Sequence, residues 1–311
     1  MSASLLAGAL LAVLVGRSPA GAVPAQRWPL PSASVFGLTA AGPDQGLAAA
    51  QSSARGVGRH LDVLNFYTAW QWRSPLPVDR LTAISNGGTT PEITWEPWDP
   101  RRGVDQGQYA LSAIAGGNFD DYVSGWARSA AAFGRPLLLR FGHEMNGTWY
   151  PWSTSRNGGT GAGYVAAYRH VHDLFVAAGA RNVRWVWSPA TTGRVAEAYP
   201  GDAYVDIVGV DGYNGGSDVV EMGGWRSPQQ LFGPTLAAVR GVVAGKPVWV
   251  NETGSSERGG DKARWVTSLF DYLRGAGVTG VVWFDLVKET DWRLASSAAA
   301  QAAATKSLRT W

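Results

Sequence analysis

The sequence predicts an α/β fold, a (β/α)8 TIM barrel, and three observations support this prediction. Short apolar runs that resemble buried strands alternate along the chain with segments of helical periodicity. No two strand-like runs are joined by a hairpin turn signal, which favours a parallel sheet. Eight such runs occur in 311 residues, and eight strand–helix repeats in a chain of this length are typical of a closed barrel. A doubly wound open sheet is the structural alternative.

The expected strands are short and rich in β-branched and aromatic residues, as buried parallel strands are. They cover residues 34–38, 61–66, 92–95, 137–141, 183–187, 205–210, 248–251 and 278–284. Helical periodicity predicts helices over residues 119–133, 164–178, 228–244 and 261–275. Asp261 opens the last of these helices, where its carboxylate can accept hydrogen bonds from amides of the first turn.

The chain divides into a leader and one domain. Residues 1–22 contain an apolar run followed by small residues, which is typical of a secretion signal, and the run is too short to span a membrane. Residues 23–33 form a Pro- and Ser-rich lead-in, and residues 34–311 form a single (β/α)8 domain without a linker-like stretch. We therefore expect a secreted, extracellular protein that leaves the membrane once the signal is removed.

Composition argues against several classes of function. The net charge is +3 and its basic residues are scattered, which argues against nucleic-acid binding. The absence of Cys excludes thiol catalysis and a disulfide scaffold. His143-Glu144 begins like a zinc-protease helix, but position 147 is Gly where the second His is required. We therefore expect no metal and no cofactor, and the lack of heptads makes a monomer the default.

Two of the strand-like runs lead into a glutamate. Residues 137–141 are closely followed by Glu144, and residues 248–251 run directly into Glu252. Because the carboxyl ends of barrel strands share one face, which carries the active site, both carboxyls are expected in one cleft. A pair of opposed carboxyl groups in a cleft is the usual set of catalytic groups in a glycosidase, so we predict that the domain is catalytic.

Tryptophan is the most over-represented residue type, with 16 in the chain. Six tryptophans fall beside expected strand ends, where flat indole faces suit the apolar faces of sugar rings, namely Trp95, Trp98, Trp149, Trp152, Trp187 and Trp283. We expect those in the loops after strands to contact a sugar. Four others are expected to pack in the core, namely Trp126, Trp185, Trp249 and Trp265.

These motifs together resemble one known family. The run His143-Glu144-Met145-Asn146-Gly147-Thr148-Trp149-Tyr150-Pro151-Trp152, preceded by Arg140, resembles the acid/base motif of glycoside hydrolase family 26. Asn251-Glu252-Thr253-Gly254 resembles the nucleophile strand of that family, and residues 94–98, 210–214 and 282–284 match further segments in the family's order. The resemblance covers residues 35–295.

The resemblance implies a retaining endo-hydrolase of a β-linked polysaccharide. Glu144 would be the general acid and then the general base, and Glu252 the nucleophile that forms a covalent glycosyl-enzyme. The nearby charge of Glu252 is expected to give Glu144 the higher pKa in the free enzyme. Family carry-over also implies a set of substrate-binding and positioning residues: His143, Trp149, Tyr213, Trp283, Trp95, Arg140 and Asp211.

Several of these implied roles are specific. His143 would lie against Glu144 and the sugar, and Tyr213 would donate a hydrogen bond to Glu252. Arg140 and Asp211 would fix the positions of the reacting groups. Trp149 would be the stacking platform at the cleavage point, with Trp283 and Trp95 lining the cleft.

The substrate is less well defined than the reaction. Members of the resembled family act on β-mannan, mixed-linkage β-glucan or β-1,3-xylan, and we rank β-1,4-mannan first and mixed-linkage glucan second. Tyr150-Pro151-Trp152 departs from the Phe-Trp-Trp version associated with mannanases. The rival class is a noncatalytic secreted sugar-binding barrel, but such a protein would have lost a carboxylate. Glu96 could be an exposed loop acid or a substrate contact, and we favour the former.

Overall fold

The computed structural model describes residue 28, residues 34–41 and residues 45–311. The predicted secretion signal, residues 1–22, lies outside the described residues, as does the lead-in except for Trp28. Within the described ranges, no helix is both long and apolar enough to cross a membrane.

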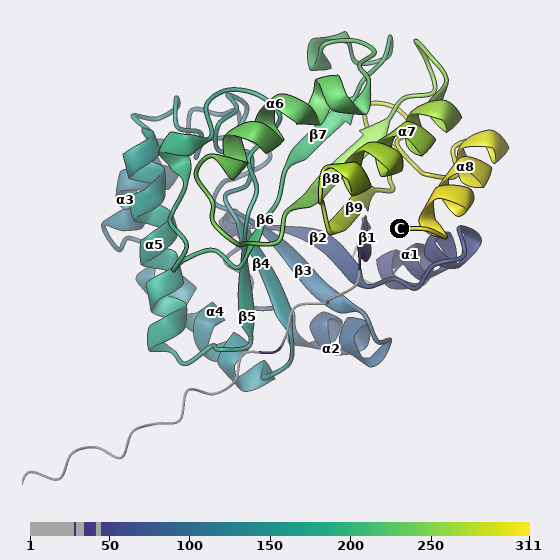
Figure 1. The fold of residues 1–311 in the computed structure, drawn as a ribbon. Helices are drawn as coiled ribbons and strands as arrows, with labels where there is room; N and C mark the ends of the chain where they lie inside the picture. Colours follow the sequence, from purple (N-terminus) through teal and green to yellow (C-terminus); the bar gives the residue numbers. More distant parts are fainter. Residues whose placement is uncertain (1–27, 29–33, 42–44) are drawn as a thin grey trace, which may run out of the picture.

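Nine parallel strands form one curved sheet in the centre of the domain (Figure 1). Their bounds are β1 Val35–Thr39, β2 Val63–Ala69, β3 Thr90–Glu96, β4 Leu137–Phe141, β5 Val183–Trp187, β6 Ile207–Val208, β7 Asp211–Asn214, β8 Trp249–Ser255 and β9 Gly280–Phe284. Strands adjacent in the chain lie side by side from β1 to β6 and from β7 to β9, and β1 also pairs with β9. This order is that of a barrel.

The barrel closes through β6 and β7, which are two pieces of one strand interrupted at Gly209 and Val210. The Gly209 amide donates to the carbonyl of Trp187 on β5 at 2.8 Å, and the Val210 amide donates to the carbonyl of Trp249 on β8 at 3.0 Å. The interrupted strand therefore bonds to both neighbours, which gives eight positions around a closed ring. The predicted (β/α)8 class is confirmed, and the open doubly wound alternative is wrong.

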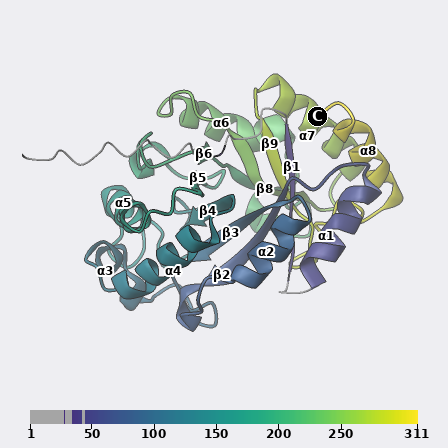
Figure 2. The ribbon, with the colours of Figure 1, turned by 90° about the horizontal axis from the view of Figure 1, so that it is seen from below.

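Helices lie on the outside of the ring of strands (Figure 2). They are α1 Gln45–Gly56, α2 Val78–Asn86, α3 Leu111–Ala115, α4 Asp120–Phe133, α5 Gly161–Ala177, α6 Pro228–Arg240, α7 Lys262–Gly275 and α8 Ala298–Leu308. Between β5 and β6 a short 3-10 turn, Ala196–Ala198, stands where a full barrel would carry a helix. All four predicted helices are confirmed, with shifted ends.

The shifted ends have local causes. Helix α5 starts earlier than predicted because the Thr160 side chain accepts a hydrogen bond from the Gly163 amide and caps the helix at Gly161. Helix α6 opens with a capping box between Ser227 and Gln230. It ends at Arg240, and Gly241 follows as its C-cap.

The amino end of the barrel is closed by an apolar layer, which we call the floor. Its residues are Val35, Val63, Leu138, Val186, Ile207, Trp249 and Val282. Trp28 packs against this floor, and its indole nitrogen donates to the carbonyl of Asn182 at 2.9 Å. The Arg184 guanidinium lies 5.5 Å from the Trp28 ring centre. Above the floor, toward the carboxyl ends of the strands, the interior becomes polar.

Strand pleating decides which side chains face this polar interior, and it corrects two expectations. On β3, Thr94 points inward, so Trp95 points outward and stacks on Trp126 of α4 at 4.4 Å. On β9, Trp283 points outward against Trp265 of α7. Trp95 and Trp283 are 0% exposed, so the expectation that they line the cleft is wrong. The four tryptophans predicted for the core are confirmed as buried.

Trp95→Ala should therefore destabilise the fold. Removing a fully buried indole from a stacked pair leaves a cavity between β3 and α4, and we expect a loss of about 3–5 kcal/mol in the free energy of unfolding, measured in urea. Trp72, whose ring is 56% exposed, provides the control, and Trp72→Ala should cost less than about 1 kcal/mol. Equal effects of the two substitutions would contradict the packing role.

Candidate active site

Glu144 is placed by a sharp turn after β4. Gly142, directly beyond the strand, has φ = 54°, and Glu144 itself has φ = 52°, a left-handed conformation that glutamate rarely adopts. The Glu144 amide donates to the carbonyl of Ser188 at 2.7 Å, and its carbonyl accepts from the Gly147 amide at 2.9 Å. These bonds hold a backbone conformation that costs roughly 1–3 kcal/mol, a form of strain that clusters at functional sites.

Glu252 reaches the interior through an irregularity in β8. The pairing of β8 with β9 shifts register between Val250 and Thr253. As a result the consecutive residues Asn251 and Glu252 both make contacts inside the barrel, because a bulge re-aims a side chain that regular pleating would point away. The tyrosine hydroxyls of Tyr67 and Tyr213 donate to the two oxygens of Glu252, Tyr67 to Oε2 at 2.6 Å and Tyr213 to Oε1 at 2.5 Å.

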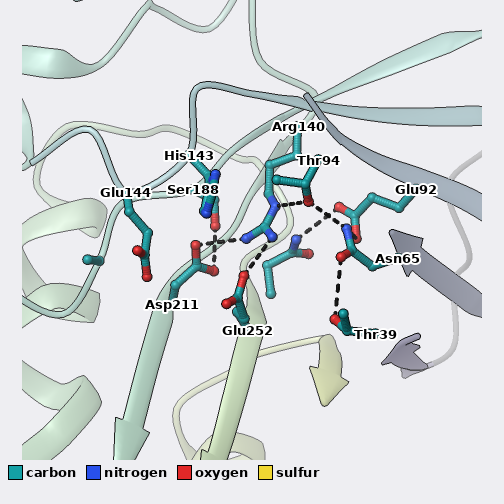
Figure 3. A network of polar contacts seen from close by, with 12 residues as sticks. Thr39, Asn65, Glu92, Thr94, Arg140, His143, Glu144, Ser188, Asp211 and Glu252 are labelled. Atoms are coloured by element: carbon teal, nitrogen blue, oxygen red, sulfur yellow. Dashed lines mark hydrogen bonds and ion pairs between the residues drawn. The ribbon is translucent and has the colours of Figure 1, made fainter. Parts of the chain in front are cut away.

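Arg140 joins the two sides of the site. Its guanidinium donates to Asp211 Oδ2 at 2.8 Å, to Glu252 Oε2 at 2.6 Å and to Thr94 Oγ1 at 2.9 Å (Figure 3). The side chain is 0% exposed, so its charge is compensated entirely within the barrel. Ser188 Oγ donates to the other oxygen of Asp211 at 2.7 Å, which completes the hold on that carboxylate.

A further carboxyl, that of Glu92, lies deeper in the barrel. It accepts hydrogen bonds from Asn65 at 3.2 Å and from Asn251 at 2.9 Å, and Asn65 also donates to Thr94 Oγ1 at 2.8 Å. Burial raises the pKa of Glu92, while Arg140 and the two amides lower it. Thr39 of β1 donates to Asn65 Oδ1 at 3.4 Å, so the network around Arg140 continues toward the floor and its members come from six strands, β1, β2, β3, β4, β7 and β8 (Figure 3).

Glu144 lies in a different environment from Glu252. The indole nitrogen of Trp149 donates to Glu144 Oε2 at 2.6 Å. Burial, and then the charge of Glu252, raise the pKa of Glu144 to about 8, and the Trp149 hydrogen bond and Arg140 oppose this shift. The Glu144 carboxyl is therefore protonated at neutral pH, which is the state that a general acid requires.

Trp149 lies at the rim of the cleft with 43% of its surface exposed. Its ring rests against the backbone of Gly147, where an added Cβ would come within 2.5 Å of the indole. Gly147 therefore leaves room for the ring in the position from which it reaches Glu144.

The remaining expected site residues lie below the cleft surface or at its wall. The His143 ring is 0% exposed and packs against Tyr67 and Tyr150, so the expected contact between His143 and a sugar is wrong. Burial lowers the pKa of His143, which keeps the ring neutral. Arg140 also lies beneath the cleft, where it contacts Glu252. Asp211 and Tyr213 reach the cleft wall, where Tyr213 makes the expected hydrogen bond.

The cleft at the carboxyl ends of the strands has a volume of about 1050 Å³ and contains both glutamates. Trp98 lines the cleft as expected, whereas Trp152, expected on the same ground, is 0% exposed. Several lining residues were not among the expected ones, namely Tyr67, Glu96, Tyr150, Phe284 and Lys288. Tyr67 lies two residues after Asn65 on β2, and side chains two apart on a strand face the same side. An inward-facing Asn65 would therefore have predicted an inward-facing Tyr67. Glu96 is only 7% exposed, so its interpretation as an exposed loop acid is wrong.

Within the residues that the structure describes, no group of three or more His, Asp or Glu side chains is arranged to hold a metal ion. The polar interior is instead occupied by the hydrogen bonds around Arg140.

A barrel with two buried glutamates in one cleft, Glu144 three residues beyond β4 and Glu252 within β8, has the architecture of a glycoside hydrolase. The chain belongs to glycosyl hydrolase family 26, whose family model matches residues 81–251. It is 37% identical over 260 residues to Endoglucanase H of Acetivibrio thermocellus, a match that covers 79% of this chain and 27% of that protein. It is 35% identical over 86 residues to a mannan endo-1,4-beta-mannosidase of Bacillus subtilis, covering 26% of this chain and 24% of that one. The chain thus spans about a quarter of the length of each relative.

Solved structures support the fold. A family 26 β-mannanase from Bacteroides ovatus superposes with a TM-score of 0.65 at 19% identity, over 89% of both chains. The family assignment and the barrel class therefore agree with the resemblance found in the motifs.

Arg140→Met should destabilise the protein strongly. The substitution removes the cation that Asp211 and Glu252 share in a buried site, and breaking one partner of a buried ion pair costs about 3–5 kcal/mol in the free energy of unfolding. Urea denaturation at neutral pH measures the loss. Arg128→Met, at an exposed position on α4, is the control and should change stability by less than about 0.5 kcal/mol. A cost below about 1 kcal/mol for Arg140→Met would refute this role.

Proposed function

We propose that the chain is a retaining endo-hydrolase of a β-linked polysaccharide, with Glu144 as acid/base and Glu252 as nucleophile. The observation that carries the proposal is the contrast between the two carboxyls in one cleft. Glu144 is protonated at neutral pH, whereas Glu252 accepts hydrogen bonds from Arg140, Tyr67 and Tyr213. Carboxyls in such different environments suit the two roles that retention of configuration requires.

In the first step, Glu252 attacks the anomeric carbon of the sugar at the cleavage point. The bond from that carbon to the glycosidic oxygen breaks, and the oxygen takes the proton of Glu144 as it leaves. The product is an ester between the sugar and Glu252, with Glu144 ionised. Arg140, Tyr67 and Tyr213 already hold the Glu252 carboxylate in place by hydrogen bonds. Little reorganisation is therefore needed when its negative charge is lost on forming the bond to the sugar.

In the second step, Glu144 takes a proton from a water molecule whose oxygen attacks the same anomeric carbon. The ester bond breaks and Glu252 leaves as a carboxylate. While Glu252 is esterified its negative charge is absent, which removes one of the causes that raise the pKa of Glu144. Glu144 is thus held in its protonated form before the first step, and the lower pKa in the esterified state favours the ionised form that takes a proton from water in the second.

Two polymers are the main candidates for the substrate. β-1,4-mannan is the first expectation from the motifs, and it is supported by the mannosidase relative. A β-glucan is supported by the likeness to Endoglucanase H, which extends over 260 residues where the mannosidase match extends over 86. This extent gives β-glucan at least equal weight, and we propose both for the first test.

The wider proposal concerns location and partners. We propose a secreted protein that acts as a monomer on an extracellular polysaccharide, without a cofactor. Trp149 and Tyr213 are the proposed sugar contacts closest to the two glutamates, because each bonds to one of them and lines the cleft.

Release of reducing ends from glucomannan, galactomannan, lichenan and β-1,3-xylan tests the proposal. We expect the wild-type protein to cleave at least one polymer, and Glu144→Ala and Glu252→Ala each to lower the rate by at least about 10³-fold, as removal of a catalytic group does. Retention is checked by following the anomeric configuration of the first product by NMR. Activity that survives both substitutions, or an inverted product, would exclude this mechanism.

The pH dependence of activity should show a basic limb. The reaction needs protonated Glu144, whose pKa is raised to about 8, so kcat/KM should fall as pH rises above about 8. Trp149→Phe removes a hydrogen bond that lowers this pKa and should move the limb to higher pH. Tyr272→Phe, on α7 outside the cleft, should leave the limb in place. A limb that does not move in Trp149→Phe would argue against Glu144 as its origin.

A further inference from the structure

Glu96 is a buried acid in the cleft that the proposed reaction does not use. It is the last residue of β3, and alternation with the outward-facing Trp95 points it into the barrel mouth. It lines the same cleft as Glu144 and Glu252. The two steps of hydrolysis require only those two glutamates, so a third carboxyl at this wall needs another explanation.

The contacts of Glu96 leave it open toward the cleft. Its Oε2 accepts a hydrogen bond from the indole nitrogen of Trp98 at 3.1 Å. Among the described residues, no donor meets its Oε1 and no Lys or Arg side chain forms an ion pair with it. A buried carboxyl without a cation is costly, so this arrangement is typical of a group kept for a ligand.

Trp98 places an aromatic surface beside this carboxyl. The ring lines the cleft and is only partly buried, and it is held edge-on by Tyr150 at 5.2 Å and Trp152 at 5.7 Å. A pyranose ring presents an apolar face and hydroxyl groups at its edge. An indole with a carboxylate at its side offers a partner to each of these.

We propose that Glu96 and Trp98 form a sugar-binding position, in which Glu96 accepts a hydrogen bond from a hydroxyl of one pyranose unit and Trp98 contacts the same unit. The proposal rests on the proposed function and deepens it, because it assigns a residue that binds the polysaccharide without touching the bond that breaks. The ligand class is a neutral β-linked polysaccharide.

Several charges act on Glu96. Burial and the charge of Glu252 raise the pKa of Glu96, the Trp98 hydrogen bond, Arg140 and Lys288 lower it, and together they bring it to about 7. The carboxyl is therefore ionised above about pH 7 and protonated below it. Because an ionised carboxylate is the stronger acceptor, sugar binding should tighten as pH rises through about 7.

The experiment measures binding in a Glu144→Gln background, which cannot cleave and lacks the Glu144 carboxyl, whose pKa is about 8. The ligand is whichever panel polymer the wild-type protein cleaves, and the readout is Kd by affinity electrophoresis. Adding Glu96→Gln should weaken binding roughly tenfold at pH 8, the size of one charge-assisted hydrogen bond. Adding Glu197→Gln, at an exposed position outside the cleft, should change Kd less than about twofold.

The pH dependence separates a binding role from a merely structural one. In the Glu144→Gln background, affinity should rise between about pH 6 and pH 8 and should be flat once Glu96→Gln is added. Trp98→Phe removes a hydrogen bond that lowers the pKa of Glu96, so it should move the midpoint to higher pH. Thermal melting confirms that each variant is folded.

The possible failures are distinguishable. If the wild-type protein cleaves none of the polymers and binds none, the proposed function fails and this inference falls with it. If a polymer is cleaved but Glu96→Gln leaves both Kd and its pH dependence unchanged, the inference alone is overturned.

Discussion

The buried guanidinium of Arg140 is the constraint on which the site depends. It lies between Asp211 and Glu252 with no exposed surface, and it fixes the position of both carboxylates through charged hydrogen bonds. Without this cation, the barrel mouth would hold several carboxyls in a low-dielectric space with no compensation. The buried charge of Arg140 therefore stabilises Asp211 and Glu252 as two carboxylates side by side.

The barrel architecture distributes this charge among strands that are far apart in sequence. Arg140 comes from β4, Asp211 from β7 and Glu252 from β8, and each side chain faces inward because of strand pleating or a bulge. The environments of the two glutamates then differ by their neighbours alone. Glu252 accepts from three donors, whereas Glu144 is held by one indole and a strained backbone.

Much of the fold and the reacting pair could be predicted from the sequence. The eight strand positions follow from apolar runs of the right length, and Glu144 and Glu252 follow from their places at two strand ends. Trp95 and Trp283 were misplaced because a motif gives a residue's position along a strand but not the face on which it lies. Thr94 and Glu96 are two residues apart on one strand, so their side chains face the same side, and an inward Thr94 would have placed Glu96 inside as well.

Other features depend on contacts that no local pattern shows. Tyr67 reaches Glu252 across the barrel from 185 positions away in the chain, and nothing near Tyr67 indicates that partner. The bulge that turns Glu252 inward is a property of the pairing between β8 and β9. His143 was expected at the sugar from the family resemblance, but the left-handed turn at Glu144 separates the directions of the two side chains.

The apolar floor and Trp28 affect how the buried polar layer exchanges protons with the solvent. Because the amino end of the barrel is closed by packed hydrocarbon, the charged layer exchanges protons and water with the solvent through the cleft mouth. Among the described residues, a sugar chain lying in that mouth would cover the open side of the charged layer. Exchange of protons with the solvent then belongs to binding and dissociation, while during the two chemical steps the proton that Glu144 gives to the glycosidic oxygen is replaced by one from the attacking water.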